Sequence, residues 1–362
     1  MEKIRRIGVL TSGGDAPGMN AAIRAVTRKA LEEGIEVMGI IGGYSGLIED
    51  NIVQLKSGSV SNIISHGGTM LYSNRCLDFK TEEGMAKAIA TCKRHNIDAI
   101  VAIGGDGTFR GATDLSLRGI PTIGVTGTID NDITATDYTV GFDTAMNTII
   151  DTLDRLCDTC ESHARCNVVE VMGRECGLLA LNSGIAAGAM GVCIPEVEFN
   201  EEKMIQNIIK AKEDGKRGMI VVVSEALFEV DENGNKIRYG EVLAKKIEAK
   251  TGIETKFARM AHVVRGGSPT LRDRLTATRM GAKAVELLIN GESNKVVIED
   301  DGDITSLDIV FALTTDRMYK GKLKEGDLDK FGAEEIAQME AICEKRRNEI
   351  KSLYKMAKEV RR

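Results

Sequence analysis

The sequence lacks any long apolar run that would indicate a membrane segment. No stretch stays apolar over the roughly 18 residues of a membrane span, and the opening residues, MEKIRRIGVL, lack the apolar core of a secretory signal. A net positive charge is also lacking, because the 362 residues carry a formal net charge of -6 and the pI is ≈ 5.5. We therefore expect a cytoplasmic protein that binds neither membranes nor nucleic acids.

Several familiar motifs are missing too. No GxxxxGK segment followed by Ser or Thr is present, which argues against a P-loop NTPase, and the segment from Gly105 to Arg110 lacks the third glycine of a dinucleotide-binding fingerprint. The eight cysteines follow no disulfide spacing, so we expect reduced thiols. Cys157 and Cys160 form a CxxC pair without a second ligand pair, which favours packing on a helix over zinc or redox chemistry.

The chain is long enough for two domains, and it is rich in glycine, with 39 residues of this type. Short apolar runs alternate with glycine-rich turns and amphipathic stretches, which predicts βαβ units and a mostly parallel sheet. The predicted strands are Ile7–Thr11, Glu36–Ile41, Ala99–Ile103, Thr122–Val125, Asn167–Val171, Val192–Pro195 and Met219–Ser224, and the predicted helices include Asn20–Glu33 and Met85–His95.

Three glycine-rich turns directly follow predicted strands. They are SGGD at 12–15, GGDGT at 104–108 and GTIDND at 127–132. Ligands of open α/β sheets bind outside the carboxyl ends of the strands, and glycines there let backbone N–H groups approach phosphate oxygens. The three turns together predict a phosphate-binding site.

Charged side chains accompany these turns. Asp106 is suited to reach a magnesium ion on bound phosphates, and Asp130 is suited to accept a hydroxyl proton. Taken alone, a DND triplet is more typical of a turn. Guanidinium groups suit phosphate binding, although any single arginine is more often a solvated surface residue. The candidates are Arg75, Arg165, Arg174 and Arg265.

The C-terminal segment has the periodicity of a helix. Apolar residues recur every three or four positions, and Arg346 interrupts the series once. Packing of this helix on its own chain is the favoured interpretation, and contact with another subunit is the alternative. The apolar positions are Ile336, Met339, Cys343, Ile350, Leu353, Ala357 and Val360.

Six segments in fixed order resemble the bacterial ATP-dependent 6-phosphofructokinase family. They are SGGDAPGMNAAIR, GGDGT, GTIDNDI, DYTVGFDTA, VVEVMGR and HVVRGGSP, and the resemblance runs from about Ile4 to Lys320. It implies a phosphofructokinase-like α/β fold of two Rossmann-like, three-layer α/β/α domains with mostly parallel sheets. Residues 1–140 plus about 264–316 would bind the nucleotide, and residues 141–263 plus about 317–362, with the C-terminal helix, would bind the sugar phosphate.

The resemblance also implies roles for individual residues. Asp130 resembles the base that takes the proton of the sugar 1-hydroxyl, Arg174 the group that steadies the transferred phosphoryl, and Asp106 the Mg²⁺ carboxylate. Thr128 and Gly14 resemble further catalytic positions. The nucleotide contacts would be Gly14, Tyr44, Arg75, Cys76, Gly105, Asp106, Gly107 and Thr108. The sugar-phosphate contacts would be Thr128, Asp130, Asp132, Arg165, Met172, Gly173, Arg174, Glu225, Lys256, His262 and Arg265.

The resemblance further implies a homotetramer that shares its active sites, with Arg165 and Lys256 supplied by a neighbouring subunit. Fructose 6-phosphate and ATP would be the substrates, with Mg²⁺ as cofactor. Gly107 and Gly127 predict ATP rather than pyrophosphate as donor, because family members that use pyrophosphate carry Asp and Lys at these places. A side chain there is expected to fill the space of the α-phosphate.

Some positions depart from the family pattern. Tyr72 stands where glycine is usual, Thr126 replaces a proline, and Lys256 replaces an arginine, which predicts weaker sugar binding. In the effector pocket Arg24, Arg28 and Lys216 match the family. Charged residues are replaced there by Ser57, Cys157, Met190 and Asp214. We therefore expect little activation by ADP or inhibition by phosphoenolpyruvate.

Two other functions remain open from the sequence. One is a kinase for a different sugar phosphate, such as tagatose or sedoheptulose phosphate, which would use the same Asp130 and Asp106. The other is a non-catalytic regulatory paralogue, suggested by Tyr72, Lys256 and the altered effector pocket but opposed by the presence of the expected chemical residues.

Overall fold

The computed structural model describes residues 4–360, which form two compact units that are each discontinuous in sequence. Unit 1 contains the chain up to residue 129, residues 133–144 and residues 265–343. Unit 2 contains residues 130–132, 145–264 and the chain from residue 344 onward. The two units share helices α5, Phe142–His163, and α11, Ala333–Val360.

Unit 1 is built on a seven-stranded sheet with the strand order β13-β12-β5-β4-β1-β2-β3. The five central strands are parallel, and the edge strands β3 and β13 run antiparallel to their neighbours. The strands are β1 Arg6–Ser12, β2 Glu36–Ile40, β3 Ile52–Leu55, β4 Ala99–Gly104, β5 Thr122–Thr126, β12 Lys295–Asp300 and β13 Asp303–Asp308.

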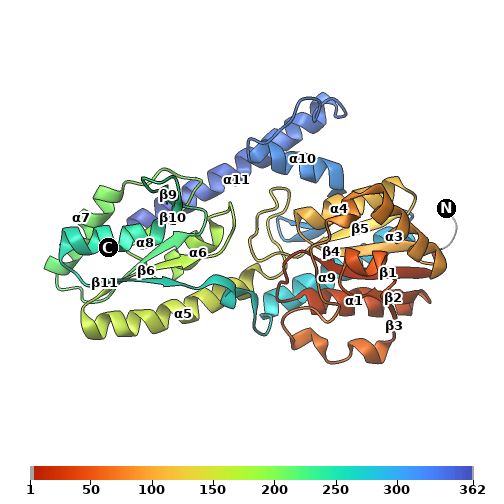
Figure 1. Ribbon diagram of the computed structural model, residues 1–362, viewed down its shortest axis with the longest axis horizontal. Coiled ribbons are helices and arrows are strands. Elements are labelled where there is room, and N and C mark those ends of the chain that lie inside the picture. The colour runs from red at the N-terminus through yellow and green to blue at the C-terminus, as the bar shows by residue number, and fades with distance from the viewer. Residues whose placement is uncertain (1–3, 361–362) are drawn as a thin grey trace. The chain divides into compact units, whose positions relative to one another are not determined.

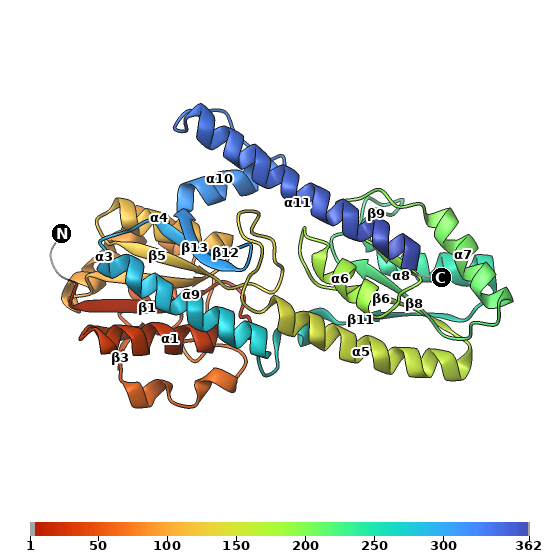
Figure 2. The same ribbon diagram turned by 180° about the vertical axis from the view of Figure 1, so that it is seen from behind.

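Helices cover both faces of this sheet (Figures 1 and 2). Helices α1 and α9 pack on each other along one face, and α3, α4 and α10 cover the other. The helices are α1 Met19–Glu32, α2 Tyr44–Ile48, α3 Glu82–Arg94, α4 Asp106–Leu117, α9 Leu271–Ile289 and α10 Ile309–Tyr319. Short 3-10 turns, η1 Ser57–Val60, η2 Ile63–Ser65 and η3 Asp78–Lys80, follow β3 or precede α3.

Unit 2 has a parallel four-stranded sheet with the order β11-β6-β8-β7. Alternation along β8 explains its layers, because Val221 and Val223 join the core beneath α7 and α8, while Val222 lies against Gly184 of α6. The elements are β6 Cys166–Val171, β7 Gly191–Cys193, β8 Met219–Ser224, β11 Thr255–Arg259, α6 Leu178–Ala186, α7 Glu201–Glu213, α8 Tyr239–Thr251 and η4 Ala261–Arg265.

A small antiparallel hairpin, β9 Phe228–Val230 and β10 Lys236–Arg238, precedes α8. Its turn is held by Asp231, whose carboxylate accepts N–H bonds from Asn233 and Asn235.

The two units confirm the expected α/β class with mostly parallel sheets, but one segment lies elsewhere than expected. We placed residues 317–362 with the sugar-phosphate domain, whereas residues 317–343 belong to unit 1 by their contacts. Phe331 packs edge-on against Phe311, with ring centroids 6.2 Å apart, and Cys343 Sγ donates to the Thr315 carbonyl. These contacts tie the segment to α10.

Two further expectations concern cysteines and membranes. All eight cysteines are free thiols, and the Cys160 sulfur accepts a bond from Asn167 Nδ2 at 2.8 Å. Among residues 4–360, no helix has the length and apolar character to cross a membrane.

Candidate active site

The first two glycine-rich turns of unit 1 touch each other at the ends of neighbouring strands. Ser12 pairs with Gly104 in the parallel ladder, and the Thr108 hydroxyl donates to the Ser12 carbonyl at 3.0 Å. A Cβ at Gly104 would lie 2.3 Å from Thr108 Oγ1 and 2.4 Å from Ser12 O. The close approach of the two turns therefore requires glycine at position 104.

Tyr44 contacts the second of these turns from within the hydrophobic core. Its hydroxyl donates to the Thr108 carbonyl at 2.6 Å, and its ring stacks on Phe79 with centroids 4.1 Å apart. The side chain is buried, and burial raises the pKa of its hydroxyl, which therefore remains a proton donor at neutral pH. The structure thus places this predicted nucleotide contact in the hydrophobic core, where it holds the turn in place.

The turn GGDGT opens helix α4. Gly105 is the N-cap without a side-chain cap, so backbone N–H groups at this helix start are available to an anion. Asp106, the first helical residue, forms an ion pair with Arg110 at 2.8 Å and keeps part of its side chain exposed. A Cβ at Gly107 would meet nothing within 4 Å. The helix start is therefore open at position 107.

Gly127 has different surroundings. Its N–H donates to the Gly104 carbonyl at 2.9 Å, and an added Cβ would lie 3.2 Å from Ile103 Cγ2 and 3.4 Å from Met19 Cε. A side chain at this position would therefore press on the core first. Gly107 is therefore the open position of the two, and the room for an α-phosphate stays a prediction at both.

Tyr72 lies in the segment that carries Arg75 and Cys76. It has a φ of 54°, a left-handed conformation that suits glycine, and the residue is 67% exposed. Its carbonyl accepts the Thr11 hydroxyl at 2.8 Å, which anchors the segment to β1. Arg75 is exposed and Cys76 is half-buried. The backbone at position 72 thus has the left-handed conformation that favours glycine, although the residue is tyrosine.

Arg265 lies against the first turn, within unit 1. Its Nη1 donates to the Asp15 carbonyl at 3.1 Å, and a Cβ at Gly14 would come within 2.7 Å of that nitrogen. Gly14 therefore leaves room for this guanidinium.

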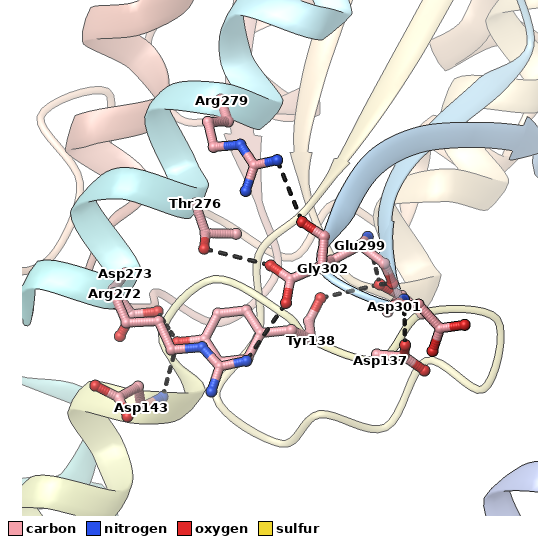
Figure 3. Close-up of polar contacts among 11 residues, drawn as sticks. Asp137, Tyr138, Asp143, Arg272, Asp273, Thr276, Arg279, Glu299, Asp301 and Gly302 are labelled. Atoms are coloured by element: carbon pink, nitrogen blue, oxygen red, sulfur yellow. Dashed lines mark hydrogen bonds and ion pairs between the residues drawn. The ribbon is translucent and has the colours of Figure 1, made fainter.

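The chain between the DND turn and α5 is clamped by a buried network in unit 1 (Figure 3). Asp273 of α9 accepts the Tyr138 hydroxyl and the Gly141 N–H at 2.6 Å each, and it also accepts both the N–H and the hydroxyl of Thr144. Arg272 lies over the Tyr138 ring, 4.1 Å from its centroid. The network therefore holds residues 138–144, part of the DYTVGFDTA segment, against α9.

The DND turn belongs to unit 2. Asp130 is 1% exposed and its Oδ2 lies 3.3 Å from Nε of Arg174, whose side chain is half-exposed. Asn131 is buried with a φ of 47°, a conformation that asparagine tolerates better than most residues. Thr128, at the end of unit 1, is buried, and its carbonyl accepts the Thr139 hydroxyl. Asp132 is half-buried. A buried carboxylate therefore faces a partly solvated guanidinium.

Glu225 fixes the backbone that carries Arg174. Its Oε1 accepts N–H bonds from Gly173 at 3.3 Å and from Arg174 at 3.0 Å. Gly173 and Arg174 have φ values of 140° and 51°, and Met172 before them is buried. The structure thus brings together Asp130, Met172, Gly173, Arg174 and Glu225 at the carboxyl ends of β6 and β8.

Glu254 pairs with two basic residues of unit 2, Arg165 and Lys256, that are among the predicted sugar-phosphate contacts. Arg165 Nε lies 2.6 Å from Glu254 Oε2, and Lys256 Nζ lies 2.8 Å from Oε1. Hydrogen bonds from Lys256 and Arg165 hold the pKa of Glu254 below its usual range. His262 is exposed nearby in sequence, on η4. The pairing had a sequence signal, since an acid stands two residues before Lys256, but we did not predict it.

The predicted effector positions include three uncharged residues, Ser57, Cys157 and Met190. Met190 is buried in the hydrophobic core of unit 2, Cys157 is half-buried, and Asp214 is exposed. Lys216 is exposed on unit 2, and on unit 1 Arg28 and Ser57 are exposed while Arg24 is half-buried.

Comparisons with known proteins agree on one family. The family model described as phosphofructokinase matches residues 6–288. An ATP-dependent 6-phosphofructokinase of Clostridium botulinum is 50% identical over 320 residues, covering 88% of this chain and 97% of the relative. A Clostridium perfringens protein, ATP-dependent 6-phosphofructokinase 1, is 49% identical over 322 residues, covering 89% and 98%.

Solved structures give the same result. The phosphofructokinase of Saccharomyces cerevisiae has a TM-score of 0.81 at 30% identity, with 93% of this chain covered. This chain spans 50% of that yeast chain.

Proposed function

The chain belongs to the phosphofructokinase family, and from this premise we propose that it is an ATP-dependent 6-phosphofructokinase. It transfers the γ-phosphoryl group of ATP to the 1-hydroxyl of D-fructose 6-phosphate and produces fructose 1,6-bisphosphate, a step of glycolysis. The observation that carries the proposal is the buried Asp130 carboxylate, held 3.3 Å from the Arg174 guanidinium in the DND turn.

Asp130 and Arg174 suit complementary roles. The Asp130 carboxylate accepts the proton of the sugar 1-hydroxyl as the hydroxyl oxygen attacks the γ-phosphorus. Arg174 is half-exposed, so its guanidinium can turn toward the transferred group and offset its negative charge. Glu225 keeps the Arg174 backbone in its left-handed conformation and thereby directs the side chain.

The start of α4 is the site we assign to the ATP phosphates and to Mg²⁺. Its uncapped N–H groups and the open space at Gly107 suit phosphate oxygens. Asp106 offers partly exposed carboxylate oxygens, the ligand type that Mg²⁺ prefers, so the residues present fit the ion. When bound, Mg²⁺ would neutralise phosphate charge.

The remaining assignments concern the sugar phosphate and the assembly. We assign the 6-phosphate to Arg165, Lys256, His262 and Arg265, with Arg165 and Lys256 acting on the site of a neighbouring subunit in a homotetramer. The basic character of these residues and the half-exposed Arg165 support the assignment. We place the enzyme in the cytoplasm, in keeping with its glycolytic relatives.

The first experiment measures phosphorylation of fructose 6-phosphate by the purified protein with MgATP and, separately, with pyrophosphate. Turnover with ATP alone is the expected result. Turnover with pyrophosphate would contradict the donor assignment at Gly107. Turnover of tagatose or sedoheptulose phosphate in place of fructose 6-phosphate would assign a different substrate, and inactivity with all of them would favour the regulatory paralogue.

Replacing the base tests the role of Asp130. Asp130→Ser is expected to lower kcat by about 10²- to 10⁴-fold, because the variant has no carboxylate to take the proton. Steady-state kinetics at saturating ATP measures the loss. The control is Asp158→Ser, at an exposed position of α5 in the same unit, which should retain wild-type kcat. A kcat within tenfold of wild type in Asp130→Ser would contradict the proposed base.

A further inference from the structure

Arg346 is buried in unit 2 on the inner face of α11. The residues Arg346, Ile350 and Tyr354 are each at most 6% exposed, and they continue the face of Met339 and Cys343. An arginine is seldom buried unless polar groups satisfy its guanidinium, since removing a charge from water is costly. We therefore expect the buried Arg346 guanidinium to have a specific hydrogen-bond partner.

That partner is the backbone of the DND turn. Arg346 Nη2 donates to the Asn131 carbonyl at 2.5 Å, a bond between residues 215 positions apart. Cys176 Sγ lies 4.0 Å from the same carbonyl oxygen. Glu349, one turn along α11, lies 3.7 Å from Arg346 Nη1 and gives the guanidinium a partly exposed counter-charge.

A half-buried acid, Glu196, also stands near the same guanidinium. Burial raises the pKa of Glu196, and the Gly177 N–H and the positive charge of Arg346 oppose that rise. Glu196 Oε1 accepts the Gly177 N–H at 2.7 Å. Arg346 thus bonds to the DND turn and also lies near Glu196, which holds the start of α6.

The carbonyl that Arg346 binds lies next to the proposed catalytic carboxylate in the sequence. It belongs to the planar peptide between Asn131 and Asp132, so fixing this oxygen fixes the plane on which both neighbours depend. Asn131 holds a left-handed φ of 47°, a conformation that surrounding contacts must maintain. Asp130, the residue before, carries the carboxylate that faces Arg174.

We propose that Arg346 is a positioning residue for the DND turn, and that α11 therefore stabilises the active conformation of the loop that carries Asp130. The catalytic consequence rests on the proposed function, whereas the restraint of the loop does not. Arg346 lies beyond the 6–288 segment matched by the family model. The C-terminal helix would thus contribute a residue to loop geometry from outside that segment.

Three full-length variants test the proposal. Arg346→Met removes the donors but keeps an extended apolar side chain, and Arg346→Lys keeps the charge without the planar fork. Arg347→Met is the matched control, because Arg347 is the neighbouring exposed residue of the same helix. Thermal unfolding of each variant first establishes that the fold is retained.

The first readout is hydrogen–deuterium exchange in the peptide that contains Asn131. We expect faster exchange there in Arg346→Met, an intermediate rate in Arg346→Lys and the wild-type rate in Arg347→Met. Wild-type exchange in Arg346→Met would overturn the proposal. This readout needs no activity, so it decides the role of Arg346 even if the wild type fails to phosphorylate fructose 6-phosphate and the proposed function is rejected.

The second readout separates kcat from KM. In Arg346→Met, kcat is expected to fall about tenfold or more, the usual effect of losing a hydrogen bond from a charged donor. The KM for ATP should stay within about twofold of wild type. Arg346→Lys should recover part of kcat. An unchanged kcat in Arg346→Met, or equal losses in Arg347→Met, would overturn the proposal.

If Arg346→Met does not fold, the same measurements on Arg346→Lys test the positioning role. Faster exchange at Asn131 together with a kcat at least about threefold below wild type would support the positioning role, because a lysine cannot reproduce the planar fork of the guanidinium. Wild-type exchange and wild-type kcat in Arg346→Lys would overturn it.

Discussion

At the scale of single residues, Glu254 lies where it can compete with the substrate. Its two carboxylate oxygens pair with Arg165 and Lys256, the side chains we assign to the sugar 6-phosphate. Because hydrogen bonds from both partners lower the pKa of Glu254, the carboxylate stays ionised at neutral pH. A phosphate that binds these residues must therefore share or displace an existing anion.

Removing that anion is expected to tighten sugar binding. Glu254→Gln should lower the KM for fructose 6-phosphate by about two- to fivefold, a range set by the modest strength of exposed ion pairs. Steady-state kinetics at saturating ATP measures it, with Glu241→Gln as control, since Glu241 pairs with Lys245 elsewhere in unit 2. A higher KM in Glu254→Gln would mean that Glu254 orients the two basic groups instead.

Tyr72 is the second residue-scale case, because its backbone conformation is left-handed. Tyr72→Gly should raise the free energy of unfolding by about 0.5 to 1 kcal/mol, the strain relieved less the entropy lost by glycine. Denaturant unfolding measures the gain. Tyr72→Ala removes the ring but keeps a Cβ, so it should show no gain. A less stable Tyr72→Gly would show that the exposed ring makes a net stabilising contribution.

At the scale of elements, the network around Asp273 connects α9, the loop after the DND turn and the start of α5, all within unit 1 (Figure 3). One buried carboxylate accepts four hydrogen bonds there, including both from Thr144. Burial nevertheless raises the pKa of Asp273 above the ordinary carboxyl value. The four hydrogen bonds therefore offset only part of the cost of removing this carboxylate from water.

An amide at this position should disrupt the network. Asp273→Asn is expected to lower the free energy of unfolding by about 2 to 3 kcal/mol. The reason is that the new NH2 group faces N–H and O–H donors and cannot accept their hydrogen bonds. Denaturant unfolding at neutral pH measures the change. Asp303→Asn, at an exposed position at the start of β13, serves as control and should change stability little. A loss below about 0.5 kcal/mol would show that the clamp does not depend on the carboxylate.

The central elements were predictable from local pattern, and the long-range ones were not. Runs such as Ala99–Ile103 are apolar throughout, and β4 occupies residues 99–104 accordingly. Strand β12 escaped prediction because its short apolar run becomes a strand only by pairing with β5, far away in sequence. Likewise, Tyr44 was expected to contact the nucleotide, and only the packed structure places its ring on Phe79. The break at Arg346 was visible in the sequence, but not its partner Asn131.

At the scale of the whole molecule, the positions predicted to bind an effector carry fewer basic residues than the family pattern has. Met190 is a core residue of unit 2, and burial raises the pKa of the Cys157 thiol, which therefore carries no charge at neutral pH. The remaining basic residues are Arg24, Arg28 and Lys216. Fewer cations mean weaker capture of anionic effectors.

Regulation should be weak as a result. Millimolar ADP or phosphoenolpyruvate is expected to change the KM for fructose 6-phosphate by less than about twofold. Without the basic side chains of the family pattern, these effectors form fewer charge-assisted hydrogen bonds. Initial rates over a range of fructose 6-phosphate concentrations measure this, and light scattering under the same conditions checks for the homotetramer of a 39.2 kDa chain. Strong regulation by either compound would contradict the prediction.

The distribution of thiols has a practical consequence. Burial raises the pKa of Cys92, Cys166 and Cys176 to about 12, so these thiols resist alkylation at neutral pH. Cys76 and Cys157 are the cysteines with partial solvent access. Cys76 directly follows Arg75, a predicted ATP contact. The rate at which an alkylating reagent modifies Cys76, measured by peptide mapping with and without ATP, would therefore report ATP binding, with Cys157 as the internal reference.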